Sequence, residues 1–346
     1  MAELTHFVRA LPKVQLHCHL EGTVRAETFR ELAGRYRADS PRASGPLEAT
    51  YAFATFRDFL LTFAEVCKVL RRPADYARIA REYVTDAAAQ NVRYAEVFVS
   101  PSVWTYFHAD LDVVEAFKAM RDVFDREGAE RKIEVTLICD LTRNFGVERA
   151  QKTVELAIHL AERGLSIVGI GLGGDEVNFP ARLFTEQFAY ARAHGLHCVA
   201  HAGEAAGPES VREAIDLLGA ERIGHGVRAL DAADLVAELA RRRIALELCP
   251  TSNRLTGAVA AGTEHPIVAF DAAGVVCTVD ADDPALFSTS ISQELALVAS
   301  WLGEDALLRL ERNAIDASFA SAERKADLRR ELEAFGLETA PRPRTT

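Results

Sequence analysis

The chain has 346 residues, of which 49% are hydrophobic and 26% charged, and its formal net charge is −11 at pH 7. This composition is typical of a globular protein with a substantial core, and the length suits either two small domains or one large α/β barrel. The negative charge argues against nucleic acid as a partner, because non-specific binding to it depends on a basic surface.

Neither a targeting segment nor a membrane span is evident. Residues 1–6 lack a basic stretch followed by an apolar one, and no uninterrupted apolar run approaches membrane-spanning length. The 6 cysteines include no C-x-x-C pair, which is typical of reduced and buried thiols. We therefore expect a cytoplasmic protein without a membrane partner.

Short apolar runs alternate with longer segments of helical periodicity. We expect strands at residues 14–19, 93–100, 134–140, 167–172, 197–201, 222–225, 244–249 and 275–280. Helical segments separate them, at residues 75–90, 112–127, 147–163, 182–194, 210–218, 232–242 and 266–273. This alternation indicates parallel strands joined by right-handed crossovers, and eight repeats close into a (β/α)8 TIM barrel, an α/β fold.

An open doubly wound sheet is the competing architecture. The G-x-G-x-x-G turn of a dinucleotide-binding fold is missing after the first expected strand, which favours the barrel. We expect residues 1–336 to form a single catalytic barrel domain and residues 337–346 a flexible C-terminal tail.

The first expected strand ends in His17, Cys18 and His19. Alternate residues of a strand share one face, so the two imidazoles, about 7 Å apart at Cα, can converge on one ion. An isolated His-x-His also suits a strand that merely ends in two polar residues. Residues elsewhere in the chain must decide.

Other polar residues follow expected strands at their C-terminal ends. His201 and Glu204 follow the fifth strand, His225 ends the sixth, and Asp282 and Asp283 follow the eighth. In a barrel these ends ring one mouth, where the active sites of this architecture lie. The sequence therefore predicts a metal site at the C-terminal mouth.

Four of these side chains supply the mixed imidazole and carboxylate ligation that suits catalytic zinc: His17, His19, His201 and Asp282. Iron, cobalt and manganese are open alternatives. We expect one Zn²⁺ per chain, because no lysine after the fourth strand is available for carbamylation, although Asp175 leaves a second ion open. Water bound to such an ion becomes a nucleophile near neutral pH, so the expected reaction is hydrolytic.

Two further side chains at the mouth suit proton transfer. Glu204 lies three residues after His201, close enough to share the mouth without binding the metal, and could donate a proton to the substrate. His225, between two glycines, could orient or deprotonate the attacking water, or it could simply be a hydrogen-bonded imidazole at a strand end.

The motifs together resemble the adenosine/adenine deaminase family of the amidohydrolase superfamily, in the Glu-type branch that includes adenine and aminodeoxyfutalosine deaminases. The resemblance runs from about residue 11 to residue 320 and rests on the segments at residues 16–22, 173–176, 201–204, 222–226, 249–253 and 282–284. It implies a barrel with one zinc, and hydrolytic loss of ammonia from the 6-amino group of a purine.

The resemblance also implies a role for each site residue. The metal ligands would be His17, His19, His201 and Asp282. Glu204 would protonate purine N1, and His225 would act with Asp282 on the attacking hydroxide. The implied substrate contacts are His19, Glu21, Gly174 and Asp283, where the Gly174 backbone N–H and Asp283 would hold N3 and N7.

The expected substrate is a nucleoside, either adenosine or a 5'-modified adenosine such as aminodeoxyfutalosine. Family members that act on adenosine commonly carry Asp, a ribose 5'-hydroxyl anchor, where this chain has Glu21. Conversely, residues 173–176 are similar to nucleoside-acting members, whereas adenine-specific ones tend to have Ser-Ser-Glu there. Free adenine is the alternative substrate.

Rival functions are a barrel hydrolase that opens amide or ester bonds and a non-catalytic binding protein. A cytidine-type deaminase is disfavoured, because its H-x-E and P-C-x-x-C signature is absent. A homo-oligomer is compatible with the sequence. Apolar residues on one face of the segment at residues 51–72 predict either a lid over the pocket or an ordinary core-facing helix.

Overall fold

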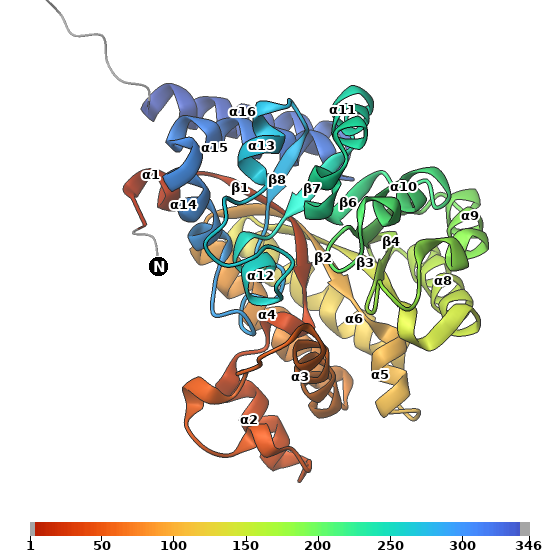
Figure 1. Cartoon of the computed structure of the whole chain (residues 1–346). Coiled ribbons are helices and arrows are strands. Elements are labelled where there is room, and N and C mark those ends of the chain that lie inside the picture. The colour runs from red at the N-terminus through yellow and green to blue at the C-terminus, as the bar shows by residue number, and fades with distance from the viewer. Residues whose placement is uncertain (1–3, 340–346) are drawn as a thin grey trace, which may run out of the picture.

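A computed structural model of the chain describes residues 4–339. Its centre is a sheet of eight parallel strands in sequential order, which confirms the expected barrel (Figure 1). The strands are β1 (Lys13–His19), β2 (Val92–Val99), β3 (Glu134–Thr142), β4 (Ile167–Gly173), β5 (His197–Ala202), β6 (Arg222–His225), β7 (Ala245–Leu248) and β8 (Cys277–Val279). The expected strand at each of these places is therefore confirmed.

The barrel closes between its first and last strands through a short contact. Cys18 of β1 forms an isolated parallel bridge with Asp282, which follows β8. The backbone N–H of His19 donates to the Asp282 carbonyl at 2.9 Å, and the Asp282 N–H donates to the His17 carbonyl at 3.1 Å. The closing contact thus involves the two segments that carry three of the expected metal ligands.

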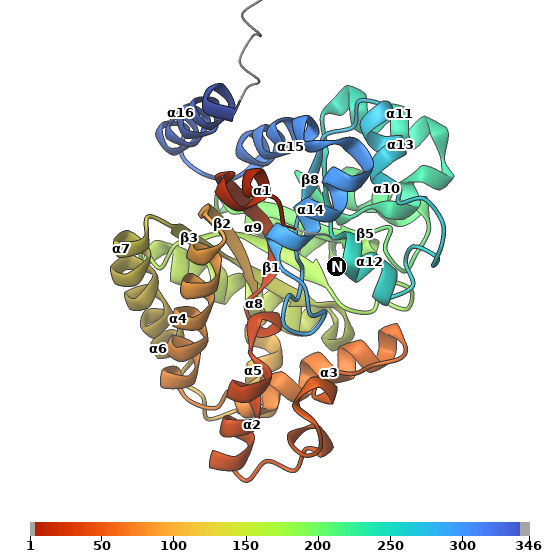
Figure 2. The same ribbon diagram turned by 90° about the vertical axis from the view of Figure 1, so that its left-hand side faces the viewer.

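Helices surround the strands, as two views at right angles show (Figures 1 and 2). They are α1 (His6–Ala10), α2 (Ala26–Arg35), α3 (Phe56–Val69), α4 (Pro73–Ala89), α5 (Pro101–Phe107), α6 (Val113–Val123), α7 (Ala129–Arg131), α8 (Gly146–Glu162), α9 (Thr185–Ala193), α10 (Pro208–Asp216), α11 (Ala233–Arg242), α12 (Pro250–Leu255), α13 (Ile267–Ala272), α14 (Ile291–Leu302), α15 (Glu304–Ala317) and α16 (Ala322–Thr339). Pro73, Pro101, Pro208 and Pro250 stand at the first position of their helices, where the missing N–H costs nothing.

The two ends of the barrel are covered differently. In both views α2 and α3 lie at one end, and α15 and α16 at the other (Figures 1 and 2). Arg93, at the start of β2, pairs with Glu331 of α16, so α16 lies near the end at which that strand begins. This arrangement leaves the C-terminal ends of the strands facing α3.

The boundary expected at residue 336 falls inside α16, which continues to Thr339. The rest of the expected tail lies outside the described residues. All six cysteines are buried and unpaired, as their scatter predicts. Among residues 4–339, no helix combines the length and apolar character needed to cross a bilayer.

Candidate active site

The four expected metal ligands converge at the C-terminal mouth. The candidate ligand atoms of His17, His19, His201 and Asp282 all lie within 4.8 Å of one another. Nε2 of His19 lies 3.1 Å from Nε2 of His201, and Asp282 Oδ1 lies 3.4 Å from His17 Nε2 and 3.6 Å from His19 Nε2. A tetrahedral zinc site with bonds of about 2.1 Å separates neighbouring ligand atoms by roughly 3.4 Å. The spacing of the four side chains therefore fits one such ion.

The electrostatics of this cluster also fit a cation. Burial lowers the pKa of His19 to about 3 and that of His201 well below its ordinary value, so both imidazoles are neutral at pH 7. Burial alone would raise the pKa of Asp282, but the surrounding imidazoles hold it well below its ordinary value. Burial would likewise lower the pKa of His17, yet the carboxylates of Asp282 and Glu247 raise it. Without a metal, His17 therefore keeps a proton. Its positive charge takes the place that the charge of a bound metal ion would take.

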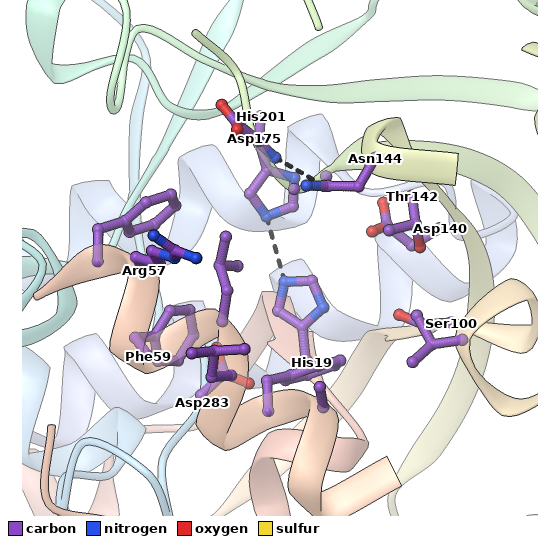
Figure 3. Close-up of a pocket in the computed structure, with 18 of the residues that line it drawn as sticks. His19, Arg57, Phe59, Ser100, Asp140, Thr142, Asn144, Asp175, His201 and Asp283 are labelled. Carbon is purple, nitrogen blue, oxygen red and sulfur yellow. Dashed lines mark hydrogen bonds between the residues drawn. The ribbon is translucent and has the colours of Figure 1, made fainter. Parts of the chain in front are cut away.

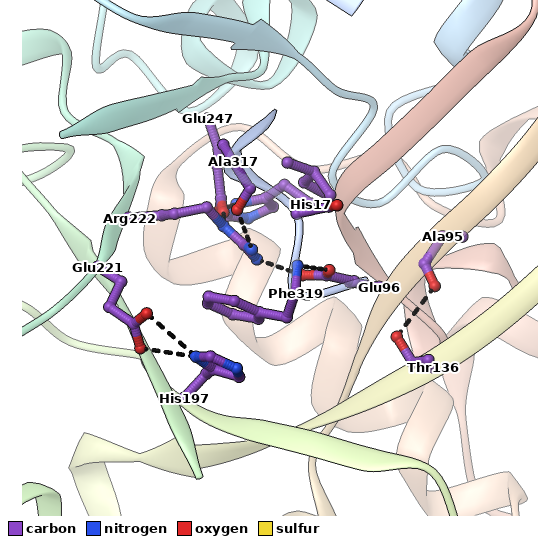
Figure 4. Close-up of polar contacts among 12 residues, drawn as sticks. His17, Ala95, Glu96, Thr136, His197, Glu221, Arg222, Glu247, Ala317 and Phe319 are labelled. Atoms are coloured by element: carbon purple, nitrogen blue, oxygen red, sulfur yellow. Dashed lines mark hydrogen bonds and ion pairs between the residues drawn. The ribbon is translucent and has the colours of Figure 1, made fainter. Parts of the chain in front are cut away.

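His17 is oriented from behind by a buried carboxylate. Its Nδ1 lies 2.8 Å from Glu247 Oε2, which directs Nε2 toward the other ligands. The Glu247 Oε1 atom accepts a 2.5 Å hydrogen bond from Arg222 Nε, and Arg222 also pairs with Glu96 at 2.6 Å and donates to the Ala317 carbonyl (Figure 4). This buried network fixes the position of the carboxylate that holds His17.

Two of the site residues adopt an uncommon backbone conformation. His225 has a φ of 62° and Asp282 a φ of 60°, in the left-handed region that side chains other than glycine rarely occupy. At Asp282 this conformation accompanies both barrel-closing hydrogen bonds, while the side chain stays beside the histidines. Such strain clusters at functional sites, where the surrounding structure overrides it.

Glu204 is positioned by a second buried glutamate. The Glu176 carboxylate accepts hydrogen bonds from the backbone N–H groups of Gly203, Glu204, Ala205 and Ala206, at 2.5 to 3.1 Å. The loop that carries Glu204 is therefore held as a unit. Burial and the nearby Asp282 raise the pKa of Glu204 to about 8, so its carboxyl holds a proton at neutral pH.

His225 lies between Glu204 and the metal cluster. Its Nε2 is 3.6 Å from Glu204 Oε2 and 3.9 Å from Asp282 Oδ2. Its Nδ1 lies 3.0 Å from Asn253 Nδ2, and His265 Nε2 lies 3.2 Å from Asn253 Oδ1. An amide N–H donates, so Nδ1 of His225 accepts and Nε2 carries the proton of the neutral ring. Burial lowers the pKa of His225 to about 4.

A cavity of about 790 Å³ opens above this cluster, and every expected site residue except His17 and Glu21 lines it. Figure 3 shows His19 and His201 at its centre, Arg57, Phe59 and Asp283 on one side, and Ser100, Asp140 and Thr142 on the other. Helix α3 supplies much of one wall, including Phe56, Leu60 and Phe63, so the expected apolar face borders the cavity.

Gly174 has a φ of 100°, and a Cβ there would lie 2.4 Å from Asn144 Oδ1. Only glycine suits this position, where the backbone borders the cavity. Asp283 lies beside Asp282, and its Oδ1 atom has no hydrogen-bond partner among the described residues. Burial and the Asp282 charge raise the pKa of Asp283 well above its ordinary value.

Glu21 lies behind the cavity wall instead of facing the space. Its Oε1 atom accepts hydrogen bonds from the Ser100 N–H at 2.8 Å and from Trp104 Nε1 at 2.6 Å, and the residue is fully buried. The 3₁₀ turn Glu21–Thr23 directs the side chain toward the start of α5. Burial raises the pKa of Glu21 to about 7.

Sequence reasoning gave no role to several polar residues near the site: Asp140, Glu176, Arg222, Glu247 and Asn253. Some of them carried a signal, because Glu247 interrupts the apolar run Ala-Leu-Glu-Leu and Asp140 ends the run Leu-Ile-Cys-Asp. A charged residue inside a buried strand requires a partner. The sequence alone does not identify that partner.

A parallel barrel that gathers three histidines and an aspartate beside a proton-holding glutamate defines a metal-dependent hydrolase of the amidohydrolase type. Comparison with known proteins gives the family. Residues 12–335 match the family described as Adenosine deaminase. The chain belongs to this family and is a metal-dependent aminopurine deaminase.

Individual relatives agree with this assignment. An aminodeoxyfutalosine deaminase from Streptomyces avermitilis is 37% identical over 338 residues, which cover 96% of this chain and 93% of the relative. An adenine deaminase from Rhodospirillum rubrum is 38% identical over 331 residues, covering 95% and 98%. A crystal structure of an amidohydrolase from Burkholderia ambifaria with bound zinc superimposes with a TM-score of 0.87 at 30% identity, covering 97% of this chain and 95% of that one.

Proposed function

We propose that the chain hydrolyses the 6-amino group of an aminopurine nucleoside, adenosine or a 5'-modified adenosine, with one zinc ion held by His17, His19, His201 and Asp282. Water adds to C6, ammonia leaves, and the product is the 6-oxopurine nucleoside. The zinc, when bound, supplies a water acidified for attack at neutral pH.

The observation that carries this proposal is the buried, proton-holding carboxyl of Glu204 beside the metal cluster, with His225 between them. Glu204 donates its proton to N1, which makes C6 electrophilic. His225 lies within 3.9 Å of Asp282 and acts with it on the attacking water: the Nε2–H of His225 orients the water, and the Asp282 carboxylate accepts its proton. The Gly174 N–H binds N3, and the raised pKa of Asp283 leaves it a proton to donate to N7.

Two observations favour a nucleoside over the free base. A cavity of about 790 Å³ lies in the range that takes drug-sized ligands, and a bare purine fills only part of it. Gly173 and Gly174 both line the cavity, so backbone without side chains borders the place where the N3 edge and the sugar would lie. Glu21 acts on the sugar side indirectly, through the position of Ser100, and His19 contacts the substrate from the metal side. Adenine is the second candidate, because relatives of similar identity carry that name.

The test is a comparison of kcat/KM for adenosine, a 5'-substituted adenosine and adenine with zinc-loaded protein, following the loss of adenine absorbance and the release of ammonia. We expect both nucleosides to be better substrates than adenine. A higher kcat/KM for adenine would overturn the nucleoside assignment. Release of no ammonia from any of the three would overturn the reaction itself.

The Glu204→Gln variant tests the assigned acid. The amide keeps the shape of the side chain but cannot protonate N1, so we expect kcat to fall by about 10²- to 10⁴-fold. Zinc content, measured by elemental analysis, should equal that of the unmodified protein, because Glu204 is outside the ligand set. Full activity in this variant would exclude Glu204 as the proton donor.

A further inference from the structure

Asp140 is a buried carboxyl in the cavity wall that has no role in the deamination steps described above. It follows the apolar part of β3, is 4% exposed, and lines the cavity. Its Oδ1 atom has no hydrogen-bond partner within residues 4–339. A buried acceptor without a donor costs free energy, and this cost is recovered when a ligand supplies the donor.

The neighbouring strand is shaped around this carboxyl. A Cβ at Gly171 would lie 2.5 Å from Asp140 Oδ1, and a Cβ at Gly173 would lie 2.5 Å from Oδ2. Both glycines belong to β4, which pairs with β3 at this level, where Asp140 lies opposite Gly171. The carboxyl therefore rests against the β4 backbone, in a space that side chains on that strand would fill.

The Thr142 hydroxyl and the terminal nitrogens of Arg143, which lie near Asp140, are already engaged with other groups. Ser100 and Thr142 share its side of the cavity (Figure 3), and the Thr142 hydroxyl is already paired with Ser102 at 2.9 Å. The nearby Arg143 directs its guanidinium to the carbonyls of Phe179 and His201. Burial and the Glu21 carboxyl raise the pKa of Asp140 to about 8.

We propose that Asp140 is a specificity-determining residue that accepts a hydrogen bond from a hydroxyl of the sugar attached to purine N9. This inference rests on the nucleoside pose of the proposed function. In that pose the Gly174 N–H binds N3, and N9 is separated from N3 only by C4. The sugar therefore leaves the ring along the β4 side, beside Gly173, against which the Asp140 carboxyl lies.

The test combines variants of Asp140 with substrates that lack single hydroxyls. We measure kcat/KM for adenosine, 2'-deoxyadenosine, 3'-deoxyadenosine and adenine with the zinc-loaded protein and with Asp140→Ala. We expect Asp140→Ala to lower kcat/KM for adenosine by about five- to tenfold, the range of a hydrogen bond between neutral groups. For adenine, and for the deoxynucleoside that lacks the interacting hydroxyl, kcat/KM should change by less than about threefold.

A matched control distinguishes this effect from general damage to the cavity. Asp175 also lines the cavity, but its carboxylate already accepts hydrogen bonds from the backbone and side-chain amides of Asn178. The Asp175→Ala variant should therefore change kcat/KM by the same factor for all four substrates. The Asp140→Asn variant keeps the shape of the side chain and should show the same substrate ranking as Asp140→Ala, with a smaller loss.

Three outcomes would overturn the inference. If Asp140→Ala lowers kcat/KM equally for all four substrates, the role of Asp140 is structural only. If kcat/KM does not change, Asp140 has no role in substrate selection. If only the value for adenine falls, the carboxyl interacts with N9–H of the free base. Isothermal titration calorimetry with the products inosine, 2'-deoxyinosine and 3'-deoxyinosine measures binding affinity without turnover. If no substrate is deaminated, equal inosine affinity of Asp140→Ala and the unmodified protein overturns the inference separately from the proposed function.

Discussion

Individual side chains at this site owe their positions to buried partners one layer further from the cavity. Glu247 holds His17, Glu176 holds the loop of Glu204, and Asn253 holds His225. Each partner fixes an orientation that the side chain would not keep by itself. Outer partners of metal ligands, as Glu247 is of His17, typically contribute a factor of 10 to 100 to affinity or activity.

The Glu247→Gln variant should therefore bind zinc about 10- to 100-fold more weakly, because a neutral amide orients the His17 ring less firmly than the carboxylate and leaves Nε2 a weaker ligand. Competition with a chromophoric chelator measures this affinity. Glu221→Gln is the matched control: it removes a carboxylate that also contacts an imidazole, that of His197, which is not a ligand. Equal zinc affinity in the two variants would contradict the role given to Glu247.

At the residue scale, the sequence predicted the ligand set because strand ends in a barrel share one mouth. Glu247 could not be assigned in this way, since its partner His17 lies 230 residues earlier in the chain. The orientation of Glu21 was equally beyond prediction. The turn Glu21–Thr23 carries it toward Trp104, and that direction depends on packing between β1, β2 and α5.

At the scale of elements, α3 forms much of one wall of the cavity. Thr55 caps its first turn by accepting from the Asp58 N–H, and Phe59 stacks on Phe287 with ring centroids 4.9 Å apart. Phe287 follows Asp283 closely in the chain. The packing of α3 is thereby linked to the loop that carries Asp282 and Asp283.

Phe59→Ala should lower the free energy of unfolding by about 3 kcal/mol, the cost of removing a buried phenylalanine. Because α3 then packs more loosely, KM should rise more than kcat falls. Chemical denaturation and steady-state kinetics measure the two effects. Leu61→Ala changes an exposed residue of the same helix, so its unfolding free energy should shift by less than about 0.5 kcal/mol. Equal destabilisation in both variants would argue against the Phe59 anchor.

The strands were predictable as elements because each is a short buried run followed by a turn, a proline or a polar strand end. Helices α14, α15 and α16 were not among the expected elements, since the alternation of strand and helix ends at β8 and no further strand marks their limits. Helix α9 begins at Thr185, later than expected, because Ala181–Phe184 forms a 3₁₀ turn. Boundaries of this kind depend on tertiary packing.

For the whole molecule, the metal ligands join parts of the chain that are far apart in sequence. His17 and His19 stand on β1, His201 on β5 and Asp282 after β8, next to the contact that closes the barrel. An ion bound by all four connects both sides of that closure to the opposite strand. Metal binding and global stability should therefore be coupled.

Removal of the metal by a chelator should abolish deamination and lower the Tm. Zinc at about a thousand times its Kd should restore about 4 kcal/mol of stability, provided that the unfolded chain binds it weakly. Differential scanning calorimetry at several zinc concentrations measures the shift. The His201→Ala variant provides the control, because its Tm should respond much less to chelator. An equal response of the two proteins would disprove the coupling.

The burial of Glu21 has a consequence for attempts to change what this enzyme accepts. Glu21 supports Ser100 and Trp104 from behind, so it sets the placement of α5 without lining the cavity itself. If only the side chains that face the ligand were replaced by those of a relative, Glu21 would still hold Ser100 and Trp104 in place. The shape of the pocket would then stay as it is. Redesign of selectivity must therefore include the supporting layer, and libraries should vary Glu21 together with Ser100 and Trp104.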